Sequence, residues 1–306
     1  MPAIAGFPLH LEGSSPHLGR DELGRLLAAL ALGATRAGEP LFVLRLCESL
    51  PHPSDAERLW EDEAVLCERE GDRLWLVTPE IIACVELIAG HVQLAPNALF
   101  RSLDEFRRLS LTTFGLLAIL RSRSLFDLHG AALVSPAGEG TLVVGPSGCG
   151  KTTTTLNLLR AGYAYGSDDV ILLDARPGEE LVVRPFRRSI GLPGPAAKEL
   201  VEASRVAGDQ IVDAIEPHVA VFPRIRQNEA TTVRRLSKLE TSLELLPQMG
   251  GTLLDARQTE RQMAAVSALA ARLTGLALGL GRDALKDPGL VARSIQDTTK
   301  IPRRPR

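Results

Sequence analysis

The feature of this chain that most constrains its fold is the octapeptide Gly-Pro-Ser-Gly-Cys-Gly-Lys-Thr at residues 145–152. A short apolar run at residues 141–144 precedes it, and a run of helical character at residues 153–159 follows it. The pattern G-x-x-x-x-G-K-[ST] is a phosphate-binding loop when a strand leads into it and a helix leads out of it. The sequence therefore predicts an α/β domain with a site for a nucleoside triphosphate.

Each position of the octapeptide suits a phosphate ligand for a physical reason. Gly145, Gly148 and Gly150 allow backbone conformations that a Cβ would forbid, so that successive N–H groups can point at phosphate oxygens. The following helix adds unpaired N–H groups and about half a positive charge at its start. We expect the ammonium of Lys151 to contact the β- and γ-phosphates, and the hydroxyl of Thr152 to bind Mg²⁺. The other residues predicted to contact the nucleotide are Ser147, Cys149 and Thr153.

A carboxylate must complete such a site, and the candidates are the pair Asp168-Asp169 and Asp174, which ends the apolar run 170–173. The helix carries the chain roughly 15 Å from the phosphates. A strand from Tyr163 returns it by roughly 20 Å at Asp168, but overshoots at roughly 40 Å by Asp174. Adjacent strand residues face opposite ways, so both carboxylates of the pair can serve only if the strand breaks there. We therefore expect the Asp pair at the phosphates and Asp174 at a solvated strand end.

Composition and charge exclude several other classes. Hydrophobic residues make up 45% and charged residues 24% of the 306 positions, which is typical of a globular protein. The net charge of −2 favours neither nucleic acid nor an anionic membrane as a partner. The most apolar stretch, 263–280, contains Arg272 and predicts a buried helix that runs into a strand rather than a membrane span. Four scattered cysteines and the lack of an N-terminal signal pattern favour reduced thiols in the cytoplasm.

Periodicity and breakers predict the elements around the octapeptide. Residues 1–110 have the pattern of a smaller α+β region. We expect a helix over 20–37, a strand over 41–46, an acidic connection over 51–63, and hairpins that pair 64–68 with 73–77 and 81–88 with 91–94. A second helix is expected over 100–124, across the end of this region. Beyond them we expect a hairpin of 129–134 with 141–144, a helix that ends at Gly162, further helices over 196–214 and 257–273, and a strand over 274–280.

Three segments together resemble the HPr kinase/phosphorylase family and its diverged bacterial relatives. They are His129-Gly130, the octapeptide, and Ser167-Asp168-Asp169. In that family an HG pair precedes a G-x-S-G-x-G-K-[ST] loop, and an A-D-D or S-D-D triplet follows the lysine by about seventeen residues, which is also the step from Lys151 to Asp168 here. The resemblance is close over about 45 residues and extends loosely to about residue 290.

The resemblance implies a P-loop kinase core with a fold similar to phosphoenolpyruvate carboxykinase. Such a core uses ATP and Mg²⁺ and transfers the γ-phosphoryl group to a serine hydroxyl. By position, Asp168 would be the base that accepts the hydroxyl proton, Asp169 would support the metal or the phosphate, and His129 would lie beside the transferred phosphate. Both aspartates and Thr152 are thus candidate metal ligands. Two arginine pairs could add positive charge, Arg187-Arg188 and Arg234-Arg235.

The chain also departs from that family. It has no counterpart of the L-E-x-R-G-x-G signature, the nearest segment being 183–188, and the usual N-terminal domain is not recognisable. We therefore expect a serine hydroxyl of a peptide or protein other than HPr as the acceptor, as in relatives that modify lasso peptides. A homo-oligomer is an expectation by analogy alone.

Two alternatives to this prediction stay open. One is a kinase for a small-molecule hydroxyl. The other is a non-catalytic nucleotide-gated module, in which the Asp pair only holds Mg²⁺. A transporter-type ATPase is disfavoured, because the chain lacks an L-S-G-G-Q segment. The predicted organisation is a region for substrate or partner recognition at 1–110, a kinase domain at 111–295 and a basic, disordered tail at 296–306.

Overall fold

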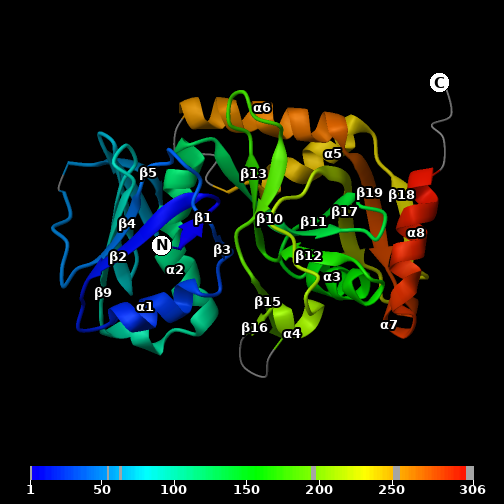
Figure 1. The fold of residues 1–306 in the computed structure, drawn as a ribbon, viewed down its shortest axis with the longest axis horizontal. Coiled ribbons are helices and arrows are strands. Elements are labelled where there is room, and N and C mark those ends of the chain that lie inside the picture. The colour runs from blue at the N-terminus through cyan, green and yellow to red at the C-terminus, as the bar shows by residue number, and fades with distance from the viewer. Residues whose placement is uncertain (1, 54, 62–63, 194–197, 251–255, 301–306) are drawn as a thin grey trace. The chain divides into compact units, whose positions relative to one another are not determined.

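The computed structural model describes residues 2–53, 55–61, 64–193, 198–250 and 256–300 (Figure 1). The chain divides into two compact units. Unit 1 contains Met1–Leu125, Pro193–Leu200 and Gly251–Glu260, and unit 2 contains Phe126–Leu192, Val201–Gly250 and Arg261–Arg306. Both units combine sheets with helices, so the chain is a mixed α/β protein, as expected.

Unit 1 is built on a nine-stranded sheet in the order β3-β1-β2-β4-β9-β8-β7-β6-β5. Its strands are β1 Ala3–Ile4, β2 Phe7–Gly13, β3 Leu32–Gly33, β4 Phe42–Leu46, β5 Glu57–Glu61, β6 Leu66–Glu70, β7 Arg73–Val77, β8 Ile81–Glu86 and β9 His91–Pro96. Its helices are α1 Arg20–Leu27, the short 3-10 helix η1 Ala98–Ser102 and α2 Glu105–Ser122.

Close packing of α2 on this sheet depends on a glycine. A Cβ on Gly115 would lie 2.5 Å from Cγ1 of Val92, so only a glycine lets the helix approach β9 this closely. Asp104 begins α2, because its side chain accepts a hydrogen bond from the N–H of Arg107 at 2.8 Å. The helix and sheet therefore bury the core of unit 1 between them.

The expectations for unit 1 are largely confirmed, with two corrections. Both hairpins form, as β6 with β7 and β8 with β9. The helix expected over 20–37 is wrong beyond Leu27, because residues 32–33 pair with β1 as strand β3. The connection expected over 51–63 contains strand β5, which pairs with β6 at the sheet edge.

The main sheet of unit 2 has the order β14-β13-β10-β11-β17-β19-β18, with β12 paired to β10, and only part of a small sheet of β15 and β16 belongs to this unit. Its strands are β10 Leu125–Val134, β11 Gly140–Val144, β12 Ala164–Ser167, β13 Val170–Asp174, β14 Val182–Pro185, β15 Ser189–Pro193, β16 Lys198–Glu202, β17 Pro217–Ile225, β18 Thr232–Arg235 and β19 Thr274–Leu280. Its helices are α3 Lys151–Arg160, α4 Ser204–Ala207, α5 Lys238–Leu245, η2 Leu246–Gln248, α7 Asp283–Lys286, α8 Pro288–Lys300 and, from Arg261 onward, α6 Ala256–Arg272.

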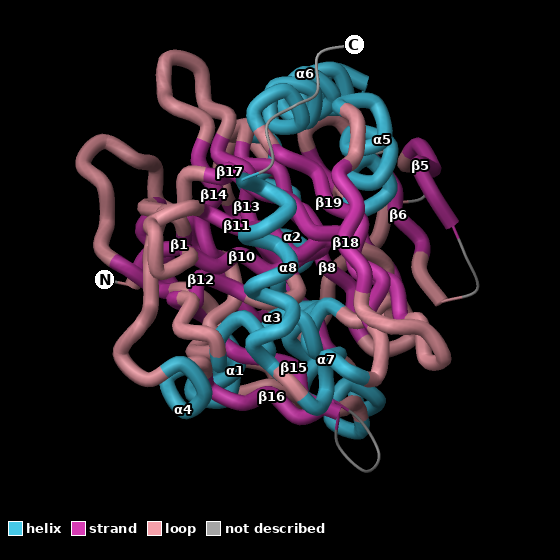
Figure 2. The backbone as a smooth tube through the Cα atoms, turned by 90° about the vertical axis from the view of Figure 1, so that its right-hand side faces the viewer, coloured by secondary structure: helices cyan, strands magenta, loops and turns pink. Residues whose placement is uncertain are grey.

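Helices cover both faces of the main sheet of unit 2. Leu158 of α3 and Val291 of α8 belong to one buried cluster with Val221 of β17, and α3 packs directly against α8 (Figure 2). Leu245 of α5 and Leu269 of α6 belong to another cluster with other strand residues. Strands β11, β17 and β19 run parallel at the centre, so their carboxyl ends meet at one edge of the sheet. Ligands bind at this edge in open α/β sheets.

Several expectations for unit 2 are confirmed. The hairpin of β10 and β11 forms, α3 stops before Gly162, whose φ is 88°, and the strand over 274–280 has the predicted bounds. The helix expected over 196–214 is wrong. Residues 198–202 form β16, α4 covers only 204–207, and Gly208 with φ 58° ends it. Residues 194–197 lie outside the described part of the chain.

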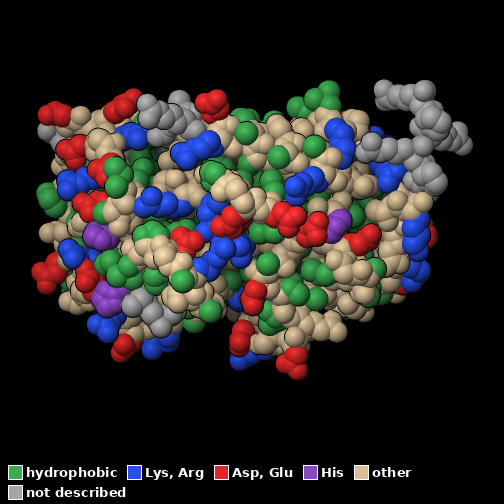
Figure 3. All heavy atoms as spheres, turned by 45° about the horizontal axis from the view of Figure 1, so that its top comes forward, with side chains coloured by type: hydrophobic (Ala, Val, Ile, Leu, Met, Phe, Trp, Pro, Cys, Tyr) green, Lys and Arg blue, Asp and Glu red, His purple; other side chains and the backbone are tan. Residues whose placement is uncertain are grey.

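The carboxyl-terminal end also differs from the expectation. Residues 296–300, assigned to a disordered tail, are the last turns of α8. The remaining tail residues, 301–306, lie outside the described part of the chain. No helix within the described residues combines the length and apolarity needed to cross a bilayer. Acidic and basic side chains are interspersed on the face drawn in Figure 3, in keeping with the net charge of −2.

Candidate functional site

The loop between β11 and α3, residues 145–150, has a backbone that only glycine adopts readily. We call it the glycine loop. The φ angles of Gly145, Gly148 and Gly150 are 156°, 78° and 109°. A Cβ on Gly150 would lie 3.1 Å from Cδ2 of Leu280 and 3.4 Å from Cγ1 of Ile225, so the ends of β19 and β17 close around the loop. Its tip, residues 146–148, is exposed to solvent.

Lys151, the first residue of α3, turns its ammonium back into the glycine loop. Its Nζ donates hydrogen bonds to the carbonyl oxygens of Gly145 at 2.7 Å and Pro146 at 3.0 Å, and the side chain is buried. Thr152 and Thr153 follow in the first turn and are half-buried. A cation is therefore bonded to the backbone of a loop whose N–H groups and helix start favour an anion.

The strand that returns from α3 breaks at the Asp pair, as expected. β12 ends at Ser167, and Asp169 has a φ of 67°, in the left-handed region that few residues other than glycine adopt. The buried hydroxyl of Ser167 accepts hydrogen bonds from the N–H groups of Phe186 at 3.2 Å and Arg187 at 3.0 Å. The break gives the two carboxylates different surroundings.

Asp168 is buried, with 3% of the residue exposed, and the N–H of Gly191 donates to its Oδ2 at 3.4 Å. The side chain of Asp169 is 18% exposed and carries two positive or ionisable neighbours. Nη1 of Arg187 lies 2.7 Å from Oδ2, and Nε2 of His129 lies 3.5 Å from Oδ1. Asp169 is therefore the more accessible carboxylate and the centre of a small charge cluster.

Backbone pairing brings His129 and Asp169 to the glycine loop. Gly130, next to His129, pairs across the hairpin with Val144, the residue directly before Gly145. The N–H of Gly130 also donates to the carbonyl oxygen of Asp169 at 3.2 Å. The HG pair, the glycine loop and the Asp pair, which are apart in the sequence, thus meet at one place in unit 2.

Only one of the four candidate arginines joins this cluster. Arg187 is buried beside the partly exposed Asp169, and burial lowers the pKa of its guanidinium while the carboxylates of Asp169 and Asp168 oppose the shift. Arg188 instead donates to the carbonyl oxygens of Gly166 and Val212 and pairs with Asp213, which is a structural role.

The pair Arg234-Arg235 lies on β18, which is separated from β11 by β17 and β19. Arg234 pairs with Glu240 at 3.0 Å, and Arg235 donates to the carbonyl oxygen of Thr299 at 3.2 Å. These two arginines therefore lie away from the strand that leads into the glycine loop.

The expectation for Asp174 is wrong. Its side chain is fully buried rather than solvated, and it accepts hydrogen bonds from Nε of Arg184 at 2.6 Å and from Nη2 of Arg176 at 2.8 Å. Burial works to raise the pKa of this carboxyl, but the bonds from Arg176 and Arg184 outweigh it and the net shift is downward. Asp174 closes the β13–β14 hairpin and takes no part in the cluster around Asp169.

Two further observations limit the chemistry of this site. Burial raises the pKa of the Cys149 thiol, which makes it a poor nucleophile at neutral pH, although the positive charge of Lys151 opposes the rise. Among the residues that the structure describes, no three His, Cys, Asp or Glu side chains form a group that could hold a metal ion.

The fold and the site define a class, a mixed α/β protein with a glycine loop beside an Asp pair. No family model matches the chain. The chain is 39% identical over 64 residues to the HPr kinase/phosphorylase of Treponema pallidum (strain Nichols), which covers 21% of this chain and 20% of that protein. It is 36% identical over 67 residues to the HPr kinase/phosphorylase of Chlorobium limicola, which covers 22% and 20%.

The resemblance inferred from the motifs is thereby confirmed, since about a fifth of the chain is similar to curated HPr kinase/phosphorylases. It spans about a fifth of the length of the curated relatives that it matches. Among solved structures, the HPr(Ser) kinase/phosphatase of Coxiella burnetii matches 56% of this chain and 90% of its own, with 15% identity and a TM-score of 0.37.

Proposed function

We propose that this chain is an ATP-dependent kinase that transfers the γ-phosphoryl group to a serine-type hydroxyl of a peptide or protein. The observation that carries the proposal is the junction of His129, the glycine loop and Asp169 through the pairing of Gly130. A phosphate donor and an acceptor hydroxyl can meet only where phosphate-binding groups and a carboxylate lie together. The kinase/phosphorylase names of the relatives agree with this reaction class.

The glycine loop fits a triphosphate. Its positive φ angles allow N–H groups to turn toward a phosphate, and the side chains at the ends of β17 and β19 leave little room for a Cβ at Gly150. The exposed tip leaves the loop open to a ligand from solvent. We propose that the ammonium of Lys151 exchanges its two carbonyl partners for phosphate oxygens when ATP binds.

Mg²⁺ fits the same place. This ion commonly uses one or two protein oxygens together with water and substrate phosphates. The half-buried hydroxyl of Thr152 and a carboxylate of Asp168 or Asp169 would supply such ligands. Bound there, Mg²⁺ would neutralise charge on the phosphates.

The proton acceptor needs a carboxylate that the acceptor hydroxyl can reach. By resemblance alone this role belongs to Asp168, but Asp168 is buried, whereas Asp169 is partly exposed beside His129. We therefore propose Asp169 as the base and Asp168 as its support. The hydroxyl oxygen would bond to the γ-phosphorus as the bond to the β-phosphate oxygen breaks, and the proton would pass to Asp169 as ADP leaves.

His129 and Arg187 would act on the same carboxylate. Arg187 holds Asp169 in one orientation through a bond of 2.7 Å, and Nε2 of His129 lies 3.5 Å from the other carboxylate oxygen. A fixed orientation matters more than high basicity here, because most of the catalysis of phosphoryl transfer comes from positioning and charge neutralisation.

We further propose residues 1–110 as the region that recognises the acceptor.

Transfer of label from γ-labelled ATP with Mg²⁺ tests the proposal, with a bacterial lysate divided into protein, peptide and small-molecule fractions as acceptors. We expect label in a protein or peptide fraction. Asp169→Asn should reduce transfer about 10²–10⁴-fold, as expected for loss of a general base, and leave ATP affinity nearly unchanged. Lys151→Ala should lose both ATP affinity and transfer.

Other outcomes would decide between the alternatives. Label in the small-molecule fraction would favour a kinase of small hydroxyl compounds. Label only in free phosphate, or none despite ATP binding, would favour the nucleotide-gated module and sink the kinase proposal. If Asp168→Asn abolishes transfer while Asp169→Asn does not, the base is Asp168.

A further inference from the structure

Strand β17 brings a surface cation to the edge of the glycine loop. It runs parallel to β11, and its last residues border Gly150. A Cβ on Gly150 would lie 3.4 Å from Cγ1 of Ile225 and 3.8 Å from Cβ of Pro223. Arg224 lies between these two residues and therefore leaves the opposite face of the strand. Its backbone is fixed at the level of the loop by the pairing of β17 with β19.

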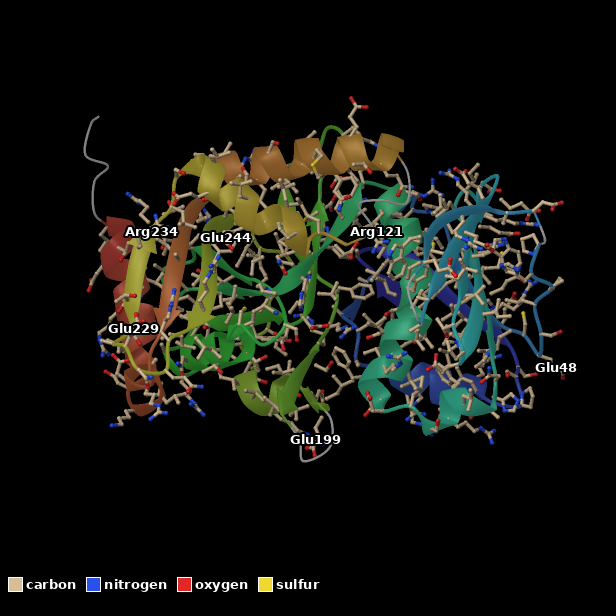
Figure 4. All side chains as sticks on the ribbon, turned by 180° about the vertical axis from the view of Figure 1, so that it is seen from behind. Glu48, Arg121, Glu199, Glu229, Arg234 and Glu244 are labelled. Atoms are coloured by element: carbon tan, nitrogen blue, oxygen red, sulfur yellow. The ribbon has the colours of Figure 1, made fainter. Side chains whose placement is uncertain are left out.

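The guanidinium of Arg224 is held by Glu244 of α5. Nη2 of Arg224 lies 2.5 Å from Oε1 of Glu244, and the two side chains are 63% and 30% exposed. Figure 4 labels Glu244 on this helix, apart from Arg234 on β18. The positive charge of Arg224 also reaches the glycine loop: burial raises the pKa of Cys149, and Arg224 is among the groups that oppose the rise. Arg224 is thus a cation beside the loop whose present partner is a side chain.

An exposed ion pair of this kind is easily exchanged. Pairs between exposed side chains contribute little to stability, because water and salt screen them and long side chains lose freedom in holding them. A guanidinium bonds more strongly to a phosphate, whose oxygens match its planar fork and carry more charge. A triphosphate at the glycine loop would therefore compete well with Glu244 for Arg224.

We propose that Arg224 is a second cation for the triphosphate and that Glu244 withholds it until the nucleotide binds. This inference rests on the nucleotide site proposed above and adds two residues to it. Lys151 contacts the phosphates from inside the loop, and Arg224 reaches them from the end of β17. Glu244 competes with the nucleotide for Arg224 and so lowers the affinity of the chain for the nucleotide.

Titration of the full chain with ATP and with ADP tests this proposal. We expect Arg224→Ala to weaken ATP binding about tenfold, in the range of one charge-assisted hydrogen bond. Glu244→Gln should tighten ATP binding about two- to fivefold, because it removes the competing charge. In the double variant the gain in ATP affinity from Glu244→Gln should disappear, since Arg224, the residue that this substitution releases, is absent.

A second ion pair between a strand arginine and a glutamate of α5 provides a matched control. Arg234 pairs with Glu240 of α5 at 3.0 Å, and its side chain is 64% exposed, close to the 63% of Arg224. Arg234→Ala should therefore leave ATP affinity unchanged. Urea unfolding of every variant separates a loss of the phosphate contact from a loss of folded protein.

The outcomes distinguish this inference from the proposed function. Equal ATP affinity of the unmodified chain, Arg224→Ala and Arg234→Ala would overturn the role of Arg224 and leave the kinase proposal standing. A gain from Glu244→Gln that persists in the double variant would overturn the withholding role of Glu244. No ATP binding by the unmodified chain would overturn the nucleotide site itself, and this inference with it.

Discussion

Nη1 of Arg187 lies 2.7 Å from Oδ2 of Asp169, and the arginine side chain is only 4% exposed. The two residues are 18 positions apart and come from different turns of the chain. Because the guanidinium is buried, it depends on the carboxylate for charge compensation, and the carboxylate depends on the guanidinium for its orientation. The stability of this part of unit 2 and the geometry of the proposed site therefore both depend on the contact between Arg187 and Asp169.

Arg187→Gln should destabilise the protein by about 3 kcal/mol, because it leaves the carboxylate of Asp169 without its main partner. Urea unfolding measures the loss. The double variant with Asp169→Asn should recover part of it, since neither charge then remains. Purely additive losses in the two single variants and the double variant would contradict a direct coupling between these side chains.

Gly150→Ala should abolish ATP binding. The residue has a φ of 109°, which costs a Cβ-bearing residue about 1–2 kcal/mol, and its Cβ would also press on Leu280 at 3.1 Å. Gly178→Ala is the control, because Gly178 has a φ of 80° but no atom within 4 Å of its Cβ position. The control should lose a similar increment of stability and keep full ATP affinity, measured by titration calorimetry. Similar ATP affinities in the two variants would argue against the glycine loop as the binding site.

The four cysteines should react in a defined order with an alkylating reagent at pH 8. Burial raises the pKa of the Cys67 and Cys84 thiols to about 11, so that only about one thiol in a thousand is ionised at that pH. Cys47 and Cys149 are less buried and should be labelled first. ATP should slow the labelling of Cys149 alone, which mass spectrometry of the digested protein can detect. Equal protection of Cys47 and Cys149 by ATP would point to a general stabilisation instead of binding at the loop.

Asp174→Asn should lower stability by about 3 kcal/mol at pH 7, because Arg176 and Arg184 lose their common partner. The pKa of the Asp174 carboxyl is lower in the folded protein than in the unfolded chain. Its contribution is therefore complete above the unfolded pKa of about 3.9 and is lost as the pH falls through the folded value. Urea unfolding from pH 7 to pH 3 should show the gap between the variant and the unmodified chain closing below about pH 4. A gap that stays constant over this range would exclude charge as its origin.

The parts of the fold that neighbouring residues dictate were predictable. Glycines with positive φ, a helix start at Lys151 and a stop before Gly162 all follow from the chemistry of adjacent residues. The length of the helix and the returning strand also indicated that the Asp pair reaches the level of the glycine loop. The resemblance to the kinase/phosphorylases rests on these same local motifs.

The errors fall where distant residues decide. Residues 198–202 pair with β15 rather than forming a helix, because a strand partner elsewhere in the chain overrides a weak local preference. Asp174 looked like a solvated strand end, but Arg176 and Arg184 approach it when β13 and β14 pair. A strand-end carboxylate gives no sign in the sequence of whether such partners will cover it.

Residue order alone specifies that a glycine-rich loop joins a strand to a helix and that two carboxylates return to it, because backbone conformation and element length are local properties. Three relationships required the folded chain: which carboxylate is accessible, the pairing of Arg187 rather than Arg188 with it, and the position of Arg224 beside the loop. These relationships depend on strand pairings between distant segments, and they determine the distance between charges and the burial around them, which sequence spacing does not encode.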